Sequence, residues 1–351
     1  MKKLLDRIFI DGLGGMAQGL FATLIIGTII QQIGLFMGGG TGDLIYELGK
    51  IAAGLTGAGI GVGVARKLEA GHLVIVSAAV VGMIGAFAGK ILSGQVLVDG
   101  NLVLAGPGEP LGAFAAAYLA IEIGILISGK TKLDIILTPL VCIGTGSAVG
   151  LFVGPPISEF MLWLGSLINW GTEQQPFLMG IVVSVLMGMI LTLPISSAAL
   201  GVILNLSGLA AGAATIGCCC NMIGFAVASW RENKFSGFLA QGIGTSMLQI
   251  PNIVRRPLIW LPVILSSAVL GPIGTMLLHM TNNATGSGMG TAGLVGPLMT
   301  WQVMTQSEAG VIMLGKIILI QFILPAAVTL LISEFMRKKK WIRQGDMKLE
   351  L

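Results

Sequence analysis

Six clusters of basic residues divide a chain that carries little other charge. Of its 20 Lys and Arg residues, 17 lie in these clusters, which are Lys2, Lys3 and Arg7; Arg66 and Lys67; Lys130 and Lys132; Arg231 and Lys234; Arg255 and Arg256; and Arg337 to Lys340 with Arg343 and Lys348. Basic residues that flank apolar segments stay on the cytoplasmic side of a membrane. Each interval between neighbouring clusters therefore crosses the membrane an even number of times, or enters it and returns.

The composition supports a membrane location. Hydrophobic residues make up 54% of the 351 residues, charged residues only 10%, and the mean hydropathy is +0.92. These values lie outside the range of soluble globular domains. Asp6 and Asp11 interrupt any signal-peptide pattern, so we expect the N-terminal end to be retained in the cytoplasm.

The apolar segments predict an all-α polytopic membrane protein with about 8–10 transmembrane helices and re-entrant hairpins. A helical span needs about 20 apolar residues. Eight segments qualify and satisfy the even count: 13–36, 48–65, 72–92, 110–129, 133–154, 176–193, 258–279 and 310–334. Both termini then lie in the cytoplasm. We expect one membrane domain over residues 1–351, with halves 1–175 and 176–335 and a basic cytoplasmic tail, 336–351, that contacts anionic lipids.

Three further apolar stretches are left over. Residues 156–170 are too short to span, and residues 198–228 are long enough for a hairpin of two short helices, which raises the count to about ten. Residues 281–308 must begin and end on the outer side. We therefore expect a re-entrant hairpin there, the alternative being an extracellular turn followed by a packing helix.

Pro, Gly and polar residues interrupt several of the apolar segments. The interruptions are GPGEP at 106–110, VGPP at 153–156, LPISS at 193–197, LGPIGT at 270–275 and TNNATGSGMGTAGLVGP at 281–297. Backbone that leaves the helix at membrane depth is tolerated only where protein or a water-filled cavity satisfies its polar groups. Interruptions of this kind indicate a transport site.

Two of these interruptions supply the first candidate residues for solute binding. Glu109 lies in the GPGEP break, where its carboxylate can accept hydrogen bonds from a solute, the alternative being an ordinary loop acid. Asn282, Asn283 and Thr285 offer polar groups in the 281–297 stretch, whose glycines allow close approach of the backbone. We expect these residues and Glu109 to contribute to one solute site.

Three other polar residues lie within or at the ends of the spans. Glu122 lies well inside 110–129, and an ionisable group there is a functional candidate unless it pairs, for example with Lys316. His72 begins the third span and can bind a hydroxyl or carry a proton, although an interfacial role is also common for histidine. Asn221 can bind a polyol or hold neighbouring helices together.

The chain has no motif of soluble catalytic machinery. The GxxxxGK[ST] pattern at 124–131 ends an apolar span and the GxGxxG pattern at 288–293 does not follow a strand, so we expect neither to be a nucleotide-binding loop. We expect no cofactor, no metal, no catalytic residue and no nucleic-acid partner. The run Cys218 to Cys220 lies in apolar sequence without metal-ligand spacing, which favours packing over a redox or metal site.

Four motifs in this order resemble the membrane IIC components of the bacterial phosphotransferase system: GPGEPLGAF, TKLDIILTPL, LPISSAAL and NNATGSGMGTAGLVGP. The chain is similar in particular to the stand-alone branch that includes the perfringolysin O regulator type. The resemblance implies a homodimer with ten helices and re-entrant hairpins, in which a Glu and a His bind the sugar. GPGEP matches part of the Gly-x-x-Glu-Pro motif of sugar IIC proteins, which implies a sugar-binding role for Glu109.

Three functions follow from the sequence. The first is a permease component in the bacterial cytoplasmic membrane that moves a small polar solute, a sugar or polyol, and that needs separate IIA and IIB proteins. The second is a membrane regulator with the IIC fold that no longer couples transport to phosphorylation. The third is a permease for another small metabolite without phosphotransferase partners. Fold-level similarity alone does not decide among them.

Overall fold

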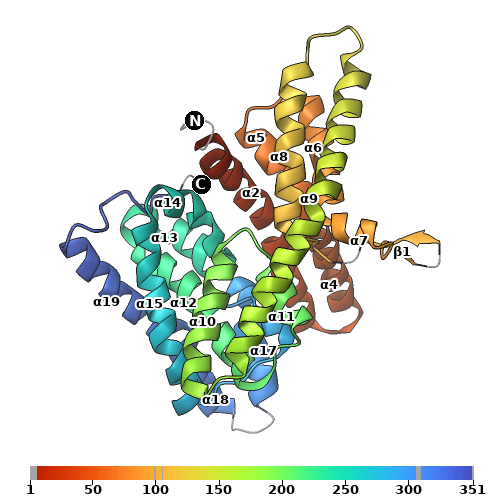
Figure 1. Ribbon diagram of the computed structural model, residues 1–351. Coiled ribbons are helices and arrows are strands. Elements are labelled where there is room, and N and C mark those ends of the chain that lie inside the picture. The colour runs from red at the N-terminus through yellow and green to blue at the C-terminus, as the bar shows by residue number, and fades with distance from the viewer. Residues whose placement is uncertain (1–5, 99, 105, 306–309, 350–351) are drawn as a thin grey trace. The chain divides into compact units, whose positions relative to one another are not determined.

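The computed structural model describes residues 6–98, 100–104, 106–305 and 310–349 (Figure 1). The chain divides into two compact units, Met1–Leu162 and Trp163–Leu351. The halves 1–175 and 176–335 expected from the sequence stay a prediction. Helices dominate both units, which confirms the prediction of an all-α polytopic membrane protein.

Unit 1 consists of helices and one short hairpin. In chain order its elements are η1 (Arg7–Gly12), α2 (Leu13–Leu20), η2 (Phe21–Ile25), α3 (Ile26–Met37), α4 (Gly39–Gly54), α5 (Thr56–Lys67), α6 (His72–Ala86), α7 (Ala88–Leu92), β1 (Leu97–Val98), β2 (Asn101–Leu102), α8 (Pro110–Ile127) and the first part of α9 (Asp134–Thr172). The elements from η1 to α3 form one continuous helical run.

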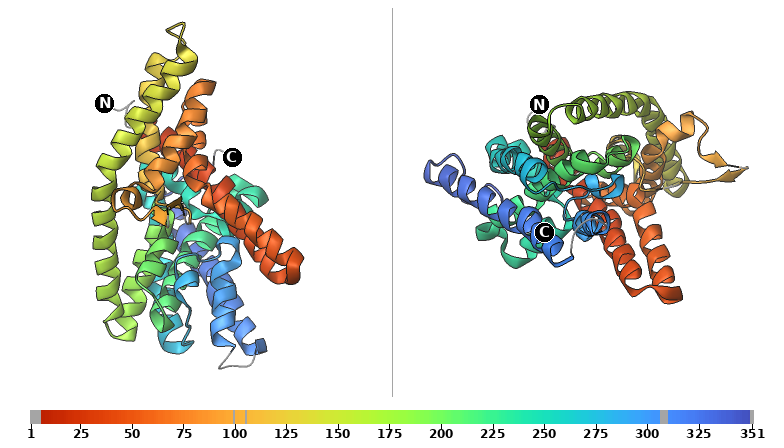
Figure 2. Two further views of the ribbon diagram at one scale, coloured as in Figure 1. Left: turned by 90° about the vertical axis from the view of Figure 1, so that its right-hand side faces the viewer. Right: turned by 90° about the horizontal axis from the view of Figure 1, so that it is seen from below.

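Helices α3 and α4 form an antiparallel hairpin (Figure 2). Gly38 and Gly39, with φ angles of +61° and +63°, make the turn. A Cβ atom on Gly34 would lie 2.5 Å from the backbone nitrogen of Tyr46, so only glycine permits the helices to approach this closely.

The predicted span 48–65 is bent. Helices α4 and α5 together are apolar enough to cross a membrane, but they meet at an angle of 50° at Leu55. Gly54, directly before the bend, has no atom within 4 Å of an added Cβ, so no neighbour on that side holds the helix straight. The predicted span at 48–65 therefore contains a bend that the sequence did not indicate.

Helix α9 corrects the prediction of a span that ends at residue 154 and a leftover stretch, 156–170. The structure has one helix of 39 residues that includes Pro139, Pro155 and Pro156. Prolines remove single hydrogen bonds, whereas irregular backbone in lipid would leave many polar groups unpaired. At 1.5 Å per residue the helix is about 58 Å long, nearly twice the hydrocarbon thickness of about 30 Å.

Unit 2 is built around helix α12. After α9, its elements are α10 (Pro176–Thr192), α11 (Ser197–Ile203), α12 (Gly208–Ala228), α13 (Trp230–Leu239), η3 (Ala240–Gly244), η4 (Ser246–Gln249), α14 (Ile250–Arg255), η5 (Pro257–Trp260), α15 (Leu261–Pro272), η6 (Ile273–Leu277), α16 (Ala284–Ser287), η7 (Ala292–Leu294), α17 (Val295–Met304), α18 (Gly310–Ile318), η8 (Leu319–Ile323) and α19 (Leu324–Lys338). Helices α10, α15 and α19 pack against α12.

Small residues let α12 be buried on all sides. Cys218, Cys219 and Cys220 are fully buried, and an added Cβ on Gly217 would collide with the carbonyl oxygen of Ser184 in α10. The predicted hairpin of two short helices over 198–228 is wrong. Helix α11 has only 7 residues, whereas α12 has 21 and is long enough to span. The small residues favour one central helix because they allow neighbours to pack on every face.

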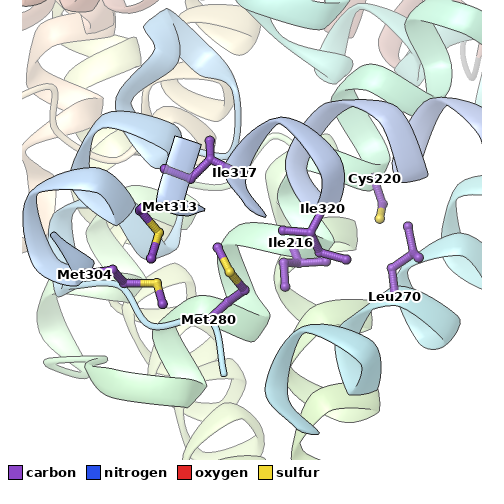
Figure 3. Packing of buried hydrophobic residues seen from close by; sticks show 8 residues of the cluster. All are labelled: Ile216, Cys220, Leu270, Met280, Met304, Met313, Ile317 and Ile320. Atoms are coloured by element: carbon purple, nitrogen blue, oxygen red, sulfur yellow. The ribbon is translucent and has the colours of Figure 1, made fainter. Parts of the chain in front are cut away.

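A methionine-rich cluster lies beside α12 (Figure 3). Met280, Met304 and Met313 form one end of the cluster, and Cys220 of α12 and Leu270 of α15 lie at the other. Flexible methionine side chains fill irregular gaps. They suit this part of the chain, where irregular segments replace regular helices.

The apolar segments of the sequence fall on helices of the structure. Within the described residues six helices are long and apolar enough to cross a membrane, and the bent pair makes seven. Helices α6 and α10 are shorter but apolar. Each of the eight predicted spans thus coincides with helical structure. In the predicted re-entrant segment the longest helix, α17, has 10 residues, which is too short to span; its course in the membrane stays a prediction.

Candidate functional site

Three interruptions of the helices come together inside unit 2. The first is 193–197, from the end of α10 to the first residue of α11. The second is 240–249, which contains η3 and η4. The third is 278–294, between η6 and α17. Ser197 Oγ donates a hydrogen bond to the carbonyl of Gly288 at 2.6 Å, and Thr291 Oγ1 donates to the carbonyl of Gly242. We call these segments the three breaks. Their contacts satisfy backbone carbonyls that lie outside regular helices.

The third break is anchored by Asn282, which is 1% exposed. Its backbone N–H donates to the carbonyl of Gly208, and its side-chain Nδ2 lies 2.7 Å from Thr215 Oγ1 and 3.0 Å from Thr300 Oγ1. Asn282 thereby joins the break to α12 and α17. Hydrogen bonds from a buried amide to two helices fix the position of the segment that carries it, so Asn282 positions the third break.

Asn283 and Thr285 lie next to this anchor and are more accessible. Asn283 is half-buried, and its Oδ1 caps the start of α16 by accepting the N–H of Gly286 at 2.9 Å. Thr285 is exposed on α16. These two side chains are therefore the members of the predicted 282–285 group that can meet a solute.

Glycine is required where the third break approaches its neighbours. Gly290 has a φ of +51°, and an added Cβ would lie 2.7 Å from the Cβ of Cys218. A Cβ on Gly288 would collide with the carbonyl of Ser197 in the first break. The backbone thus lies directly against α12 and the first break, as the Gly-rich composition led us to expect.

Asn221 lies at the centre of a polar network between α10, α12 and α15. Its Oδ1 accepts hydrogen bonds from Thr192 Oγ1 at 3.1 Å and from Trp260 Nε1 at 3.2 Å, and its Nδ2 donates to the carbonyl of Gly217 at 3.1 Å. Asn221 is fully buried. Of the two roles that the sequence left open for Asn221, these contacts favour holding the helices together.

Glu109 caps helix α8 in unit 1. Its backbone N–H donates to the carbonyl of Ala86 at 2.8 Å, and its Oε1 accepts the N–H of Leu111 at 3.4 Å. A carboxylate at the N-terminus of a helix is favoured by the helix dipole. The side chain is half-buried, so it also remains partly accessible.

Glu122 and His72, also in unit 1, have different surroundings. Glu122 Oε1 lies 2.6 Å from Arg7 Nε in an ion pair, and both side chains are about one-third exposed, at 31% and 38%. Lys316, the partner that the sequence suggested, instead donates to the carbonyl of Leu278 in unit 2 at 3.4 Å. His72 is exposed at the first position of α6.

The second break is the part of the site that sequence reasoning missed. It contains Gln241, Thr245, Ser246 and Gln249, all of which are buried. A signal was present in the sequence, because the segment AQGIGTSMLQ at 240–249 joins two glycines to four polar residues between two basic clusters. Pro is absent from this run, and the interruptions noted in the sequence all contain Pro.

The described part of the chain contains no group of three or more His, Cys, Asp or Glu residues that could hold a metal ion. The hydroxyls and amides of the three breaks are instead neutral donors and acceptors. Such groups suit a neutral, polyhydroxylated solute.

A family model described as "Phosphotransferase system, EIIC" matches residues 10–349. The match includes the three breaks of unit 2 and the capped start of α8 in unit 1. Among the curated proteins, none matches the chain.

Proposed function

The chain belongs to the EIIC family of the phosphotransferase system, and on this premise we propose that it moves a sugar or polyol across the bacterial cytoplasmic membrane. Membership implies a multi-pass membrane permease component that works with IIA and IIB proteins and takes a sugar-type substrate. The narrower similarity to the perfringolysin O regulator branch stays a prediction.

The observation that carries this proposal is the meeting of three breaks in unit 2. Interrupted helices with exposed backbone groups are the usual solute-binding elements of transporters. Here the contacts of Ser197 with Gly288 and of Thr291 with Gly242 join the breaks through hydroxyl and carbonyl groups. These hydrogen bonds are made by neutral hydroxyl and carbonyl groups. A polyhydroxylated solute carries hydroxyls of its own, so it can replace the protein partner in such a hydrogen bond.

We assign different proposed roles to the residues of the third break. Asn283 and Thr285 contact the solute, because their side chains are half-buried and exposed respectively. Asn282 and Asn221 hold the surrounding backbone, because their buried amides are engaged by protein groups. A Thr285→Val variant should therefore weaken solute binding without loss of expression.

Glu109 is proposed as a further solute-binding residue on the strength of its half-buried carboxylate at a helix start. Glu109→Gln keeps the side-chain size and should weaken binding by about 1.5–3 kcal/mol, the range for a hydrogen bond to a charged group. Glu159→Gln is the control, since Glu159 is an exposed carboxylate on α9. Unchanged affinity in the Glu109 variant would remove it from the site. The roles predicted for His72 and Glu122 stay hypotheses.

Uptake by purified protein in vesicles tests the function itself. Uptake of a labelled sugar that requires a IIB partner and a phosphoryl donor would support the proposal. Uptake without any phosphoryl donor would point to a permease outside the phosphotransferase system. An absence of uptake for a panel of sugars and polyols, together with altered transcription in a deletion strain, would indicate the regulator.

The orientation and assembly are also proposals. The six basic clusters support cytoplasmic termini and contact with anionic lipids, and the family resemblance supports a homodimer. Cysteines introduced at Asp43 and Lys348 test the orientation. An impermeant thiol reagent added to intact cells should label the cysteine at position 43 and spare the one at position 348.

A further inference from the structure

The residues that follow α19 fold back onto unit 2 and bind there through their backbone. Asn233 of α13 makes two hydrogen bonds to this segment: its Nδ2 donates to the carbonyl of Met347 and its Oδ1 accepts the N–H of Leu349, both at 2.8 Å. Gln249 Nε2 donates to the same Met347 carbonyl at 3.0 Å, and Asn252 Nδ2 donates to the carbonyl of Lys348 at 2.9 Å. Three side-chain amides thus hold consecutive peptide groups.

Met347 anchors the segment from the other side. Its side chain is fully buried in a cluster that includes Phe225, Ile253 and Ile259. The next side chain, that of Lys348, is exposed. Backbone contacts together with one buried side chain are the usual features of a bound peptide strand.

A buried ion pair fixes the other end of the segment. Glu232 Oε1 accepts the N–H of Gly345 at 3.3 Å and lies 2.9 Å from Arg337 Nη1. The two charged side chains are only 3% and 9% exposed. Arg337 also donates to the carbonyl of Ala228 at the end of α12. This end of the segment is therefore held by helices α12, α13 and α19.

One of the amides that hold the segment, that of Gln249, also belongs to the second break. Gln249 is the last residue of η4, and its Nε2 donates to Gln241 Oε1 at 2.8 Å as well as to Met347. Both hydrogens of this buried amide are then used, and its Oε1 accepts from Asn252. Departure of the segment would leave buried amide groups unpaired, which is costly unless the break opens to water.

We propose that residues 229–252 form a peptide-binding site whose ligand is the chain's own residues 345–349, and that occupancy of this site keeps the second break closed. The second break contains Ser246. Its hydroxyl shares a hydrogen bond with the hydroxyl of Thr192, the last residue of α10 directly before the first break. Release of residues 345–349 therefore frees one of the three breaks. This inference is independent of the solute and of whether the protein transports one.

Hydrogen–deuterium exchange of the full-length protein in detergent tests the proposal. Met347→Ala removes the anchor, and Asn233→Asp replaces the donor to the Met347 carbonyl by a carboxylate oxygen of nearly the same size. Both variants should release residues 345–349 and speed exchange of the amides in 240–249 by about tenfold or more, given the cost of truncating a buried methionine. Lys348→Ala, whose side chain is exposed, is the matched control and should exchange like the unchanged protein.

A synthetic peptide of residues 343–349 separates occupancy from damage. Added in excess to the Met347→Ala variant, it should restore the protection of residues 240–249, whereas the same peptide carrying Met347→Ala should not. Fast exchange at 345–349 with full protection at 240–249 would overturn the coupling. Undiminished protection of 345–349 in the Asn233→Asp variant would overturn the binding site itself.

Discussion

The hydroxyl oxygens of Thr192 and Ser246 lie 2.8 Å apart and share a hydrogen bond, although 54 residues separate them. Thr192 ends α10 directly before the first break, and Ser246 begins η4 in the second break. Thr192 also donates to Asn221 of α12. This hydrogen-bonded chain joins two breaks to the central helix.

Ser246→Ala should loosen this junction. The substitution removes one buried hydrogen bond and leaves the Thr192 hydroxyl with its other partners, so we expect a loss of about 1 kcal/mol in the free energy of unfolding. Reconstituted uptake should fall as well if the junction positions the solute site. Thermal unfolding in detergent measures the first effect. Ser166→Ala, at an exposed site on α9, should change neither quantity, and equal effects in the two variants would contradict the assigned role.

Gly217→Ala should destabilise the packing of α10 on α12. An added Cβ at position 217 collides with the carbonyl and Cα of Ser184, and these backbone atoms cannot move aside without shifting α10. We expect a cost of about 1–3 kcal/mol or more in the free energy of unfolding, as for other overpacked cores.

The control is Gly144→Ala in α9, where an added Cβ meets nothing within 4 Å. There the change should be neutral or stabilising by up to about 1 kcal/mol. Similar unfolding midpoints for both variants would show that α10 and α12 can separate without cost.

The ion pair between Arg7 and Glu122 predicts a specific pattern of coupling. Both side chains are about one-third exposed, so solvent screening limits the coupling energy to about 1 kcal/mol or less. Arg7→Gln, Glu122→Gln and the double variant, compared by thermal unfolding, give this energy directly. If pairing is the role of Glu122, all three variants should retain uptake. A loss of uptake in Glu122→Gln alone, with Arg7→Gln unaffected, would instead support solute binding by Glu122.

The sequence predicted the helices better than their interruptions. Apolar length located helical structure in all eight predicted segments, because a helix is the only way for a single chain segment to satisfy its backbone in lipid without a partner. The same physics explains the error at Pro155 and Pro156, where a helix that lacks individual hydrogen bonds is still better than irregular backbone. Proline signals an interruption less reliably in lipid than in water.

The partners of the polar residues could not be predicted. Asn221 was identified from its position in an apolar run, but its contacts with Thr192 and Trp260 come from segments 29 and 39 residues away. The partner of Glu122 is Arg7, 115 residues away and at the start of the first helix. Such long-range pairings depend on how helices pack, and residue spacing within one segment carries no information about them.

Two glycines before Glu109 offer a last test of how that residue is held. Gly106 and Gly108 have φ angles of +83° and +72°, so alanine at either position costs about 1–2 kcal/mol in backbone strain. An added Cβ at position 106 meets nothing within 4 Å, whereas at position 108 it lies 2.6 Å from the Cβ and 2.8 Å from the carbonyl oxygen of Ala86. That oxygen accepts the N–H of Glu109.

Gly108→Ala should therefore displace Glu109 and weaken solute binding as much as Glu109→Gln does, while Gly106→Ala lowers only the unfolding midpoint. Equilibrium binding of a labelled solute, measured beside thermal unfolding, distinguishes the two. Equal affinities in both glycine variants would show that the position of Glu109 is unimportant for binding.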